Sequence, residues 1–137
     1  MKPDGAPGVR YWLDEQIAET LYLTSISLSE LLLGVELLPG GKRKVGLASA
    51  LGELLSTLFG ARILPFDQQA ATLYASRVCS ARAAGKVISM ADGQIAAIAA
   101  VHGFTVATRD TAPFVAAGVP VVNPWEIRVH EAAPAWK

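Results

Sequence analysis

The sequence has little cysteine, no excess of either charge and no long apolar run. Cys79 is the only cysteine among 137 residues, which excludes an internal disulfide and a cysteine-based zinc site. Twelve Lys and Arg residues balance twelve Asp and Glu residues, so the chain lacks the strong positive field of a non-specific nucleic-acid binder. No apolar stretch reaches the ~20 residues that span a bilayer, and no signal-peptide pattern opens the chain. We therefore expect a cytoplasmic protein with no membrane contact.

The chain has enough apolar sequence for one domain. Hydrophobic residues make up 52% of it, and its mean hydropathy is +0.36. Prolines and glycines in residues 1–8 predict a loose entry segment. Residues 9–129 are the predicted domain, and residues 130–137 predict a disordered tail. Cys79 is expected to be a small buried residue of a helix.

Short apolar runs alternate with helical patterns along the domain. Strands are predicted at residues 21–26, 62–65, 104–107 and 119–122. Helices are predicted at residues 9–19, 28–38 after an N-cap at Ser27, 44–59, 66–84, 89–101 and 110–117. In residues 44–59, the apolar residues expected to be available to the core are Val45, Leu47, Leu51, Leu54, Leu55 and Leu58. Strands separated by helices indicate an α/β fold with parallel pairing and helices on both faces.

Three carboxylates, Glu30, Asp92 and Asp110, lie at predicted helix starts. In an open α/β sheet such positions gather in the crevice beyond the carboxyl ends of the strands. Mg²⁺ or Mn²⁺ is the natural occupant between converging carboxylates, and it can activate water for phosphodiester hydrolysis. Capping explains the same acids, because Ser27 to Glu30 and Ser89 to Asp92 have capping-box spacing and Asp110 fits an N-cap or Asx turn. The residues alone leave both interpretations open.

Four ordered segments carry a family resemblance. They are LTSISLSELLLG at 23–34, ADGQIAA at 91–97, VATRDT at 106–111 and VNPW at 122–125. Together they resemble the VapC-type toxins of the PIN-domain family, in particular their FitB-like branch. The resemblance implies a PIN-like parallel sheet flanked by helices. It also implies a metal-dependent endoribonuclease that is the toxin of a type II toxin-antitoxin pair.

The resemblance also implies roles for individual residues and for partners. Glu30, Asp92 and Asp110 match active-site acids that would hold Mg²⁺ or Mn²⁺, and Thr108 matches their polar companion. The implied partners are an RNA substrate, a second copy in a homodimer and a small VapB/FitA-like antitoxin. A basic side chain of the antitoxin would be stabilised in the acidic pocket by charge-assisted hydrogen bonds.

The sequence departs from the family pattern at its start. PIN domains open with an apolar strand that ends in an aspartate and lies at the centre of the sheet. Asp4 follows no apolar run, so we give it no such role and expect the first central strand to be missing. The strands at 21–26 and 104–107 would then pair abnormally or leave backbone groups unsatisfied, at about 1–3 kcal/mol for each buried group.

A second departure concerns the last acid. Many relatives carry Asn where Asp110 stands and a further Asp where this chain has Pro113. Three interpretations follow from the sequence. The first is an active ribonuclease, and the second is an inactive PIN-like module that binds an antitoxin or another protomer. The third is an unrelated α/β domain whose acids are only helix caps.

Overall fold

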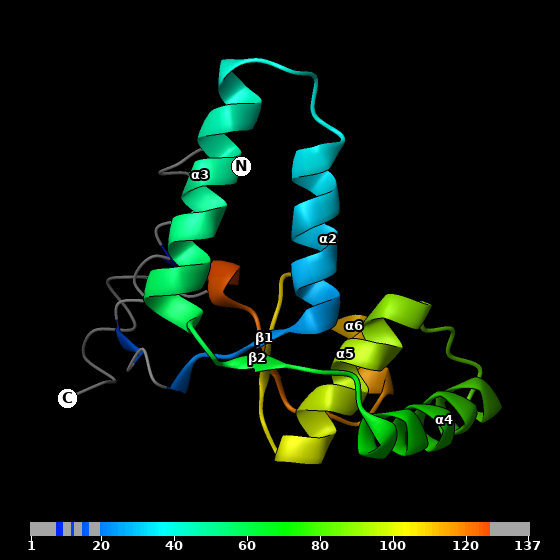
Figure 1. Cartoon of the computed structure of the whole chain (residues 1–137). Helices are drawn as coiled ribbons and strands as arrows, with labels where there is room; N and C mark the ends of the chain where they lie inside the picture. Colours follow the sequence, from blue (N-terminus) through cyan, green and yellow to red (C-terminus); the bar gives the residue numbers. More distant parts are fainter. Residues whose placement is uncertain (1–7, 10–11, 13–14, 17–19, 127–137) are drawn as a thin grey trace.

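The computed structural model describes residues 8, 9, 12, 15, 16 and 20–126. The elements follow one another as β1 (Leu23–Thr24), α2 (Ser25–Glu36), α3 (Lys42–Leu54), η2 (Leu55–Phe59), β2 (Ile63–Leu64), α4 (Gln68–Ala83), α5 (Met90–His102), β3 (Val106–Ala107), α6 (Ala112–Ala116), β4 (Val121–Val122) and η3 (Pro124–Glu126) (Figure 1). The predicted α/β class is therefore confirmed. Most of the expected 9–19 helix and of the 1–8 segment, and the whole 130–137 tail, lie outside the described residues.

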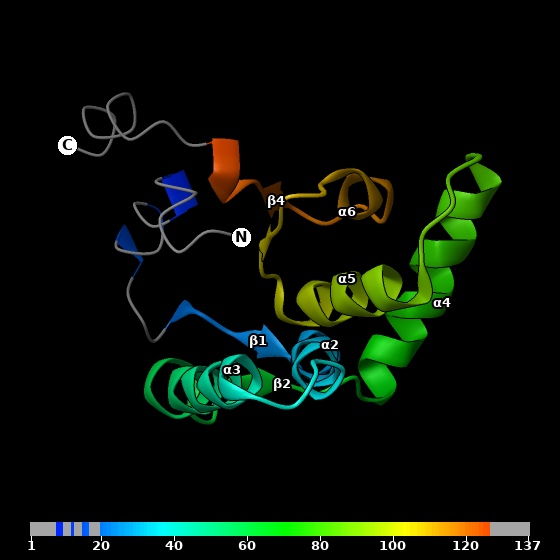
Figure 2. The same ribbon diagram turned by 90° about the horizontal axis from the view of Figure 1, so that it is seen from above.

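The strands form two separate pairs instead of one sheet. β1 pairs with β2 in parallel, with Leu23 opposite Ile63, and β3 pairs with β4 in parallel, with Val106 opposite Val121. Over the described residues, no ladder joins β1 to β3. Figure 2 shows β1 and β2 beside α2 and α3, while β4 lies near α6. Parallel pairing was predicted, and both ladders among the described residues are parallel.

The boundary between β1 and α2 differs from the prediction. A strand was expected to Ile26 and an N-cap at Ser27, but α2 begins at Ser25 and its N-cap is Thr24. The hydroxyl of Thr24 accepts a hydrogen bond from the main-chain N–H of Ser27 at 3.0 Å. Because this bond satisfies a free amide of the first turn, the helix starts three residues earlier than predicted.

The later helices begin and end where their capping residues predict. The carboxylate of Asp67 accepts a hydrogen bond from the N–H of Ala70 at 2.9 Å and caps α4. Ser89 caps α5, and Gly103 ends α5 in the left-handed conformation at φ 68°. The sequence predicts these helix ends because each capping bond joins residues that are only a few positions apart.

The core is centred on α5. One buried cluster contains Ala81, Ile88, Ala96, Phe114, Ala117 and Val119, and a second contains Ala70, Ala97 and Ile98. α5 packs closely on α4 at Gly93, where an added Cβ would lie 2.9 Å from Cε1 of Tyr74 and 3.0 Å from Cγ2 of Val78. Small residues on α5 therefore set the distance between these two helices.

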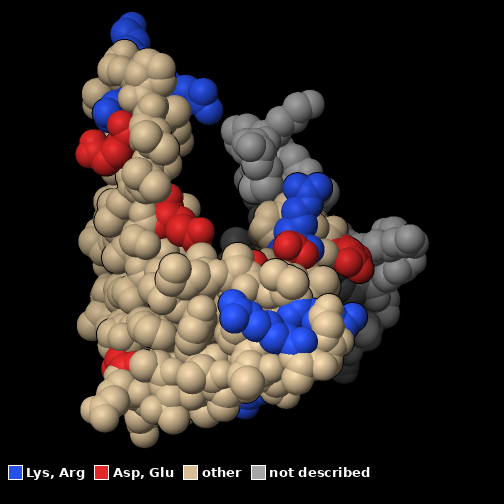
Figure 3. Space-filling model, turned by 90° about the vertical axis from the view of Figure 1, so that its right-hand side faces the viewer, with Lys and Arg blue, Asp and Glu red and all other residues tan. Residues whose placement is uncertain are grey.

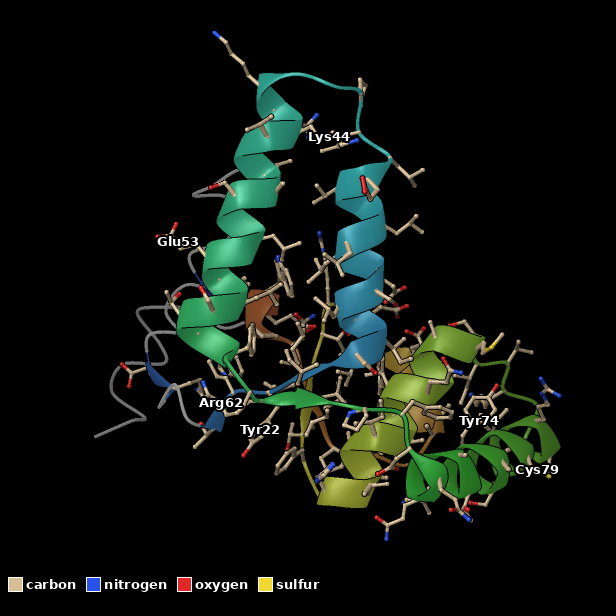
Figure 4. All side chains as sticks on the ribbon, in the orientation of Figure 1. Tyr22, Lys44, Glu53, Arg62, Tyr74 and Cys79 are labelled. Atoms are coloured by element: carbon tan, nitrogen blue, oxygen red, sulfur yellow. The ribbon has the colours of Figure 1, made fainter. Side chains whose placement is uncertain are left out.

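α2 and α3 form a two-helix arm that projects from the rest of the molecule (Figure 1), and Ile26 at the base of α2 packs against the buried cluster of Ala70, Ala97 and Ile98. Neither helix contains a buried residue, and Leu37 and Val45 are 74% and 69% exposed. The expectation that the apolar residues of the 44–59 helix serve the core is therefore wrong for α3. Figure 4 shows Lys44 between the two helices, where its Nζ donates to the main-chain oxygen of Glu36 at 3.0 Å.

Three further expectations need correction. Cys79 is exposed, on the part of α4 that lies away from the strands in Figure 4, because it occupies a helix position that faces solvent. The 44–59 helix is an α-helix only to Leu54 and continues as the π-helical η2. α6 begins at Ala112, so Asp110 precedes it. Within the described part of the chain, no helix has the length and hydropathy to span a membrane.

Candidate functional site

Glu30 lies in the second turn of α2 and has an exposed side chain. With Thr24 as the N-cap, the first turn of α2 contains no acidic residue. The expectation that Glu30 lies at a helix start is therefore wrong by about one turn. The same shift removes the capping-box explanation, since a capping glutamate must lie three residues after the N-cap. Glu30 thus has no role in starting its helix.

Asp92 lies in the first turn of α5 and is partly buried. Its main-chain N–H donates to the hydroxyl of Ser89 at 3.2 Å, which is one half of a capping box. The other half would be a bond from the main-chain N–H of Ser89 to the Asp92 carboxylate, and the described residues form no such bond. Ser89 caps α5, and the Asp92 carboxylate remains available to another group.

Asp110 lies in the loop between β3 and α6 and is exposed. Its main-chain N–H donates to the hydroxyl of Thr108 at 3.3 Å. The N-cap of α6 is Thr111, and no side chain makes a capping bond there. Asp110 therefore does not cap this helix. It borders a hollow of about 510 Å³ that Lys86 and Pro113 also line.

The loop that carries Asp110 is held from the C-terminal side by Asn123. The side-chain amide of Asn123 donates to the main-chain oxygen of Arg109 at 3.3 Å, and its Oδ1 accepts from the N–H of Trp125 at 2.9 Å. The guanidinium of Arg109 lies 5.9 Å from the ring centroid of Trp125. The sequence analysis missed these contacts, although the Asn-Pro pair at 123–124 is a recognised turn signal.

The three carboxylates share a lack of protein partners. Within the described residues, neither an ion pair nor a hydrogen bond engages the carboxylate oxygens of Glu30, Asp92 or Asp110. Asp67 differs from them, because its carboxylate caps α4. A carboxylate without a structural partner keeps its full capacity to accept from an external ligand.

The structure brings two of the three supporting elements together. α2, which carries Glu30, contacts α5, which carries Asp92. Asp110 approaches from a different element, the loop after β3. Figure 3 shows acidic side chains on both sides of the hollow between the α2 and α3 arm and the rest of the molecule. Among the residues that the structure describes, no group of three or more His, Cys, Asp or Glu side chains could hold a metal ion.

The donor chemistry of these acids suits a hard cation. Mg²⁺ is bound in proteins through one or two carboxylates together with waters and substrate oxygens. Asp92 and its neighbours offer unengaged carboxylate oxygens, which are the right ligands. The described residues do not form a complete three-carboxylate cage.

The fold and the acid-bearing segments correspond to a known protein class. Residues 5–119 match the sequence model of the PIN domain. The match covers most of the chain, and the chain belongs to the PIN-domain family.

Within the family, the chain is close to the VapC and FitB toxins. It is 51% identical to the VapC ribonuclease Y4jK of Sinorhizobium fredii over 126 residues, which cover 91% of this chain and 88% of the relative. It is 48% identical to the toxin FitB of Neisseria gonorrhoeae, over 91% of this chain and 90% of the relative. The solved structure of FitAB bound to an IR36 DNA fragment superposes with a TM-score of 0.87 and 46% identity, over 94% of this chain and 90% of that one. The resemblance inferred from the four sequence segments is therefore confirmed.

Proposed function

We propose that this chain is the toxin of a type II toxin-antitoxin pair and a metal-dependent endoribonuclease that cleaves RNA. The observation that carries the proposal is the set of three carboxylates, Glu30, Asp92 and Asp110, that have no structural partner among the described residues. Helix capping, the main alternative use of such acids, does not apply to Glu30 or Asp110. The similarity to a VapC ribonuclease at 51% identity supports the same activity.

Each residue of the proposed site has a distinct task. Asp92, Asp110 and Glu30 supply carboxylate oxygens for Mg²⁺ or Mn²⁺, and Thr108 holds the main chain at Asp110. When bound, the metal ion would lower the pKa of a water and stabilise charge on the scissile phosphate. The partial burial of Asp92 favours it as the best-positioned ligand, since its backbone is fixed by Ser89.

Replacing Asp92 by Asn tests the proposal. Asn keeps the shape of the side chain but removes the charge that holds the cation, so Mg²⁺-dependent cleavage of a mixed-sequence RNA should fall more than about tenfold. Mn²⁺ binding measured by calorimetry should weaken in the same variant. Unchanged cleavage and unchanged Mn²⁺ binding would show that Asp92 is not a metal ligand.

Asp67→Asn is the matched control. It makes the same chemical change at the start of α4, where Asp67 serves as the N-cap. Asn is as good an N-cap as Asp, so this variant should keep both stability and RNA cleavage. Loss of cleavage in both variants would indicate a general effect of removing negative charge.

The proposed partners are a VapB/FitA-like antitoxin and a second copy of the chain. The α2 and α3 arm supports a protein partner, because Leu33 and Leu37 expose 57% and 74% of their surface. Contiguous exposed apolar residues on a monomer are typical of protein interaction sites. The solved assembly of FitAB on DNA supports a partner for that relative. A single cysteine fits the proposed cytoplasmic location.

A second candidate function is an inactive PIN-like module that binds an antitoxin or another protomer. The division of the strands into two pairs favours it, since parallel strands at one edge of a continuous sheet are what positions an active site in α/β folds. The unaltered chain distinguishes the two candidates. An enzyme should cleave RNA in Mg²⁺ or Mn²⁺, whereas the inactive module should form a stable antitoxin complex without cleavage.

A further inference from the structure

Trp125 and Arg109 form an exposed pair beside the Asp110 loop. Trp125 lies in η3, which follows β4, and exposes 38% of its surface. The guanidinium of Arg109 lies over its ring, 5.9 Å from the ring centroid. Arg109 belongs to the loop after β3 and precedes Asp110 in the chain. An exposed indole and a guanidinium therefore meet beside one of the acids proposed to bind the metal.

Hydrogen bonds fix the backbone on both sides of this pair. The N–H of Thr108 donates to the main-chain oxygen of Val122 at 3.0 Å, next to the ladder between β3 and β4. The side-chain amide of Asn123 donates to the main-chain oxygen of Arg109 at 3.3 Å, and its Oδ1 accepts from the N–H of Trp125 at 2.9 Å. These bonds hold the two residues together through their main chains, so the indole and the guanidinium are not used up by them.

The guanidinium of Arg109 keeps its capacity to bind an anion. Among the described residues, neither an ion pair nor a hydrogen bond engages it. Glu126, which follows Trp125, instead accepts a hydrogen bond from the side-chain amide of Asn123 at 2.9 Å. An exposed guanidinium without a carboxylate partner is suited to phosphate, which it can bind through two parallel N–H···O bonds.

We propose that Trp125 and Arg109 bind single-stranded RNA next to the proposed active site, with one base stacked on the indole and one phosphate bound by the guanidinium. Every base has a π face, so aromatic side chains beside cations are the common means of binding single strands. The base must be unpaired and unstacked to reach the indole. Such a site rests on the proposed ribonuclease function and adds to it a place for the substrate strand.

The position of the pair favours RNA over a protein partner. Trp and Arg are also frequent at the centres of protein interfaces. Here, however, Arg109 adjoins Asp110, so a strand held by Arg109 would have its neighbouring phosphates near the acids proposed to bind the metal. The chain has a net charge of zero, so it needs local contacts of this kind to hold a polyanion.

Binding of short labelled RNA to the full chain tests the proposal. Two fluorescein-labelled hexamers, oligoadenylate and the same ribose-phosphate chain without bases, are compared by anisotropy at low salt in EDTA, where metal-dependent cleavage cannot consume them. Trp125→Ala should weaken binding of oligoadenylate about 5- to 100-fold and change binding of the abasic hexamer by less than about twofold, because only oligoadenylate can stack. Trp125→Phe keeps an aromatic face and should restore most of the affinity.

Arg109→Ala tests the phosphate contact. It should weaken binding of both hexamers and lower the slope of log affinity against log salt by about 0.7, the value for one phosphate contact on a single strand. Arg43→Ala is the matched control, because it removes the same charge in the first turn of α3, which starts at the end of the arm farthest from the strands (Figure 1). This control should keep the affinity and the salt slope of the unaltered chain. Arg109 is exposed, so its variant keeps the test valid if Trp125→Ala fails to fold.

Several results would overturn the proposal. They are absence of oligoadenylate binding by the unaltered chain at about 1 mM RNA, equal losses for the two hexamers in Trp125→Ala, or an unchanged salt slope in Arg109→Ala. Loss of self-association in Trp125→Ala with unchanged RNA affinity would assign the pair to a protein interface instead. Because binding is measured without metal, a chain that binds RNA through Trp125 but does not cleave it in Mg²⁺ or Mn²⁺ would contradict the ribonuclease activity and support the binding site.

Discussion

At the scale of single residues, the structure separates acids that cap helices from acids that do not. Asp67 and Glu30 look alike in the sequence, because both lie near the start of a helix that follows an apolar strand. In the fold the Asp67 carboxylate accepts from Ala70, whereas Glu30 lies one turn beyond the first turn of α2. The difference arises because Thr24, and not Ser27, captures the first free amide. The Thr24 hydroxyl therefore excludes the helix-capping explanation of Glu30.

Asn123 provides a test of how the Asp110 loop is held. Its amide donates to the main-chain oxygen of Arg109 and to Oε1 of Glu126, and its Oδ1 accepts from the N–H of Trp125, so Asn123→Ala removes three hydrogen bonds. We expect a loss of stability of about 1–2 kcal/mol by denaturant unfolding, because each such bond contributes about 0.5–1.5 kcal/mol. If Asp110 acts at the proposed site, cleavage should require more Mn²⁺ in this variant.

The matched change at a similar exposed position is Thr72→Ala. The hydroxyl of Thr72 bonds only to the main chain of its own helix, at Gln68. In this variant the free energy of unfolding should change by less than about 0.5 kcal/mol, and the Mn²⁺ concentration needed for cleavage should stay the same. If Asn123→Ala and the unaltered chain need the same Mn²⁺ concentration for cleavage, the hydrogen bonds of Asn123 have only a structural role.

At the scale of elements, α4 and α5 are held at a distance set by one glycine. Gly93 faces Tyr74 and Val78 of α4, and an added methyl group would have to displace one of them. Gly46 of α3 also lies inside a helix, but nothing lies within 4 Å of its would-be Cβ. The two positions share their helical backbone and differ in packing.

The same substitution should therefore have opposite effects at the two glycines. Gly93→Ala should lower the free energy of unfolding by about 1–3 kcal/mol, because overpacking outweighs the gain in helix propensity. Gly46→Ala should raise it by up to about 1 kcal/mol, because Ala is the better helix former. Chemical denaturation of both variants measures the two values. Stabilisation by Gly93→Ala would mean that α4 and α5 pack less closely than the structure indicates.

At the scale of the whole molecule, the apolar residues fall into a buried core around α5 and an exposed arm. The arm formed by α2 and α3 has no buried residue, although both helices contain many leucines. Apolar surface left in water on this scale is typical of an interface for another protein. Stability and assembly should therefore depend on different helices.

Polar substitution on the arm separates these two properties. Leu33→Glu combined with Leu37→Lys should disrupt the proposed homodimer or antitoxin complex, as measured by light scattering after gel filtration. The free energy of unfolding of the monomer should change by less than about 0.5 kcal/mol for each substitution, since both side chains are exposed. Thr72→Glu is the control, because Thr72 is exposed on α4 and lies outside the arm. An unchanged assembly in the arm variant would exclude this face as the interface.

The sequence by itself determined the features that depend on neighbouring residues. The cap at Ser89, the glycine end of α5 and the order of strands and helices follow from bonds within a few residues, and all are found. The family was also evident from four short segments, and residues 5–119 match the PIN domain. Only the tertiary structure decided which apolar faces are buried. A helix pattern shows that one side is apolar, but it does not show whether another element covers that side.

The tertiary structure also decided that the strands form two separate pairs. The sequence predicted parallel strands, but their division into two pairs depends on packing between residues that lie about 80 positions apart. In the fold, α5 and the contact between Tyr22 and Phe104 hold the two strand pairs beside a common cavity. β1 and β3 each pair along one edge with a strand from another part of the chain, and no local signal encodes these two ladders.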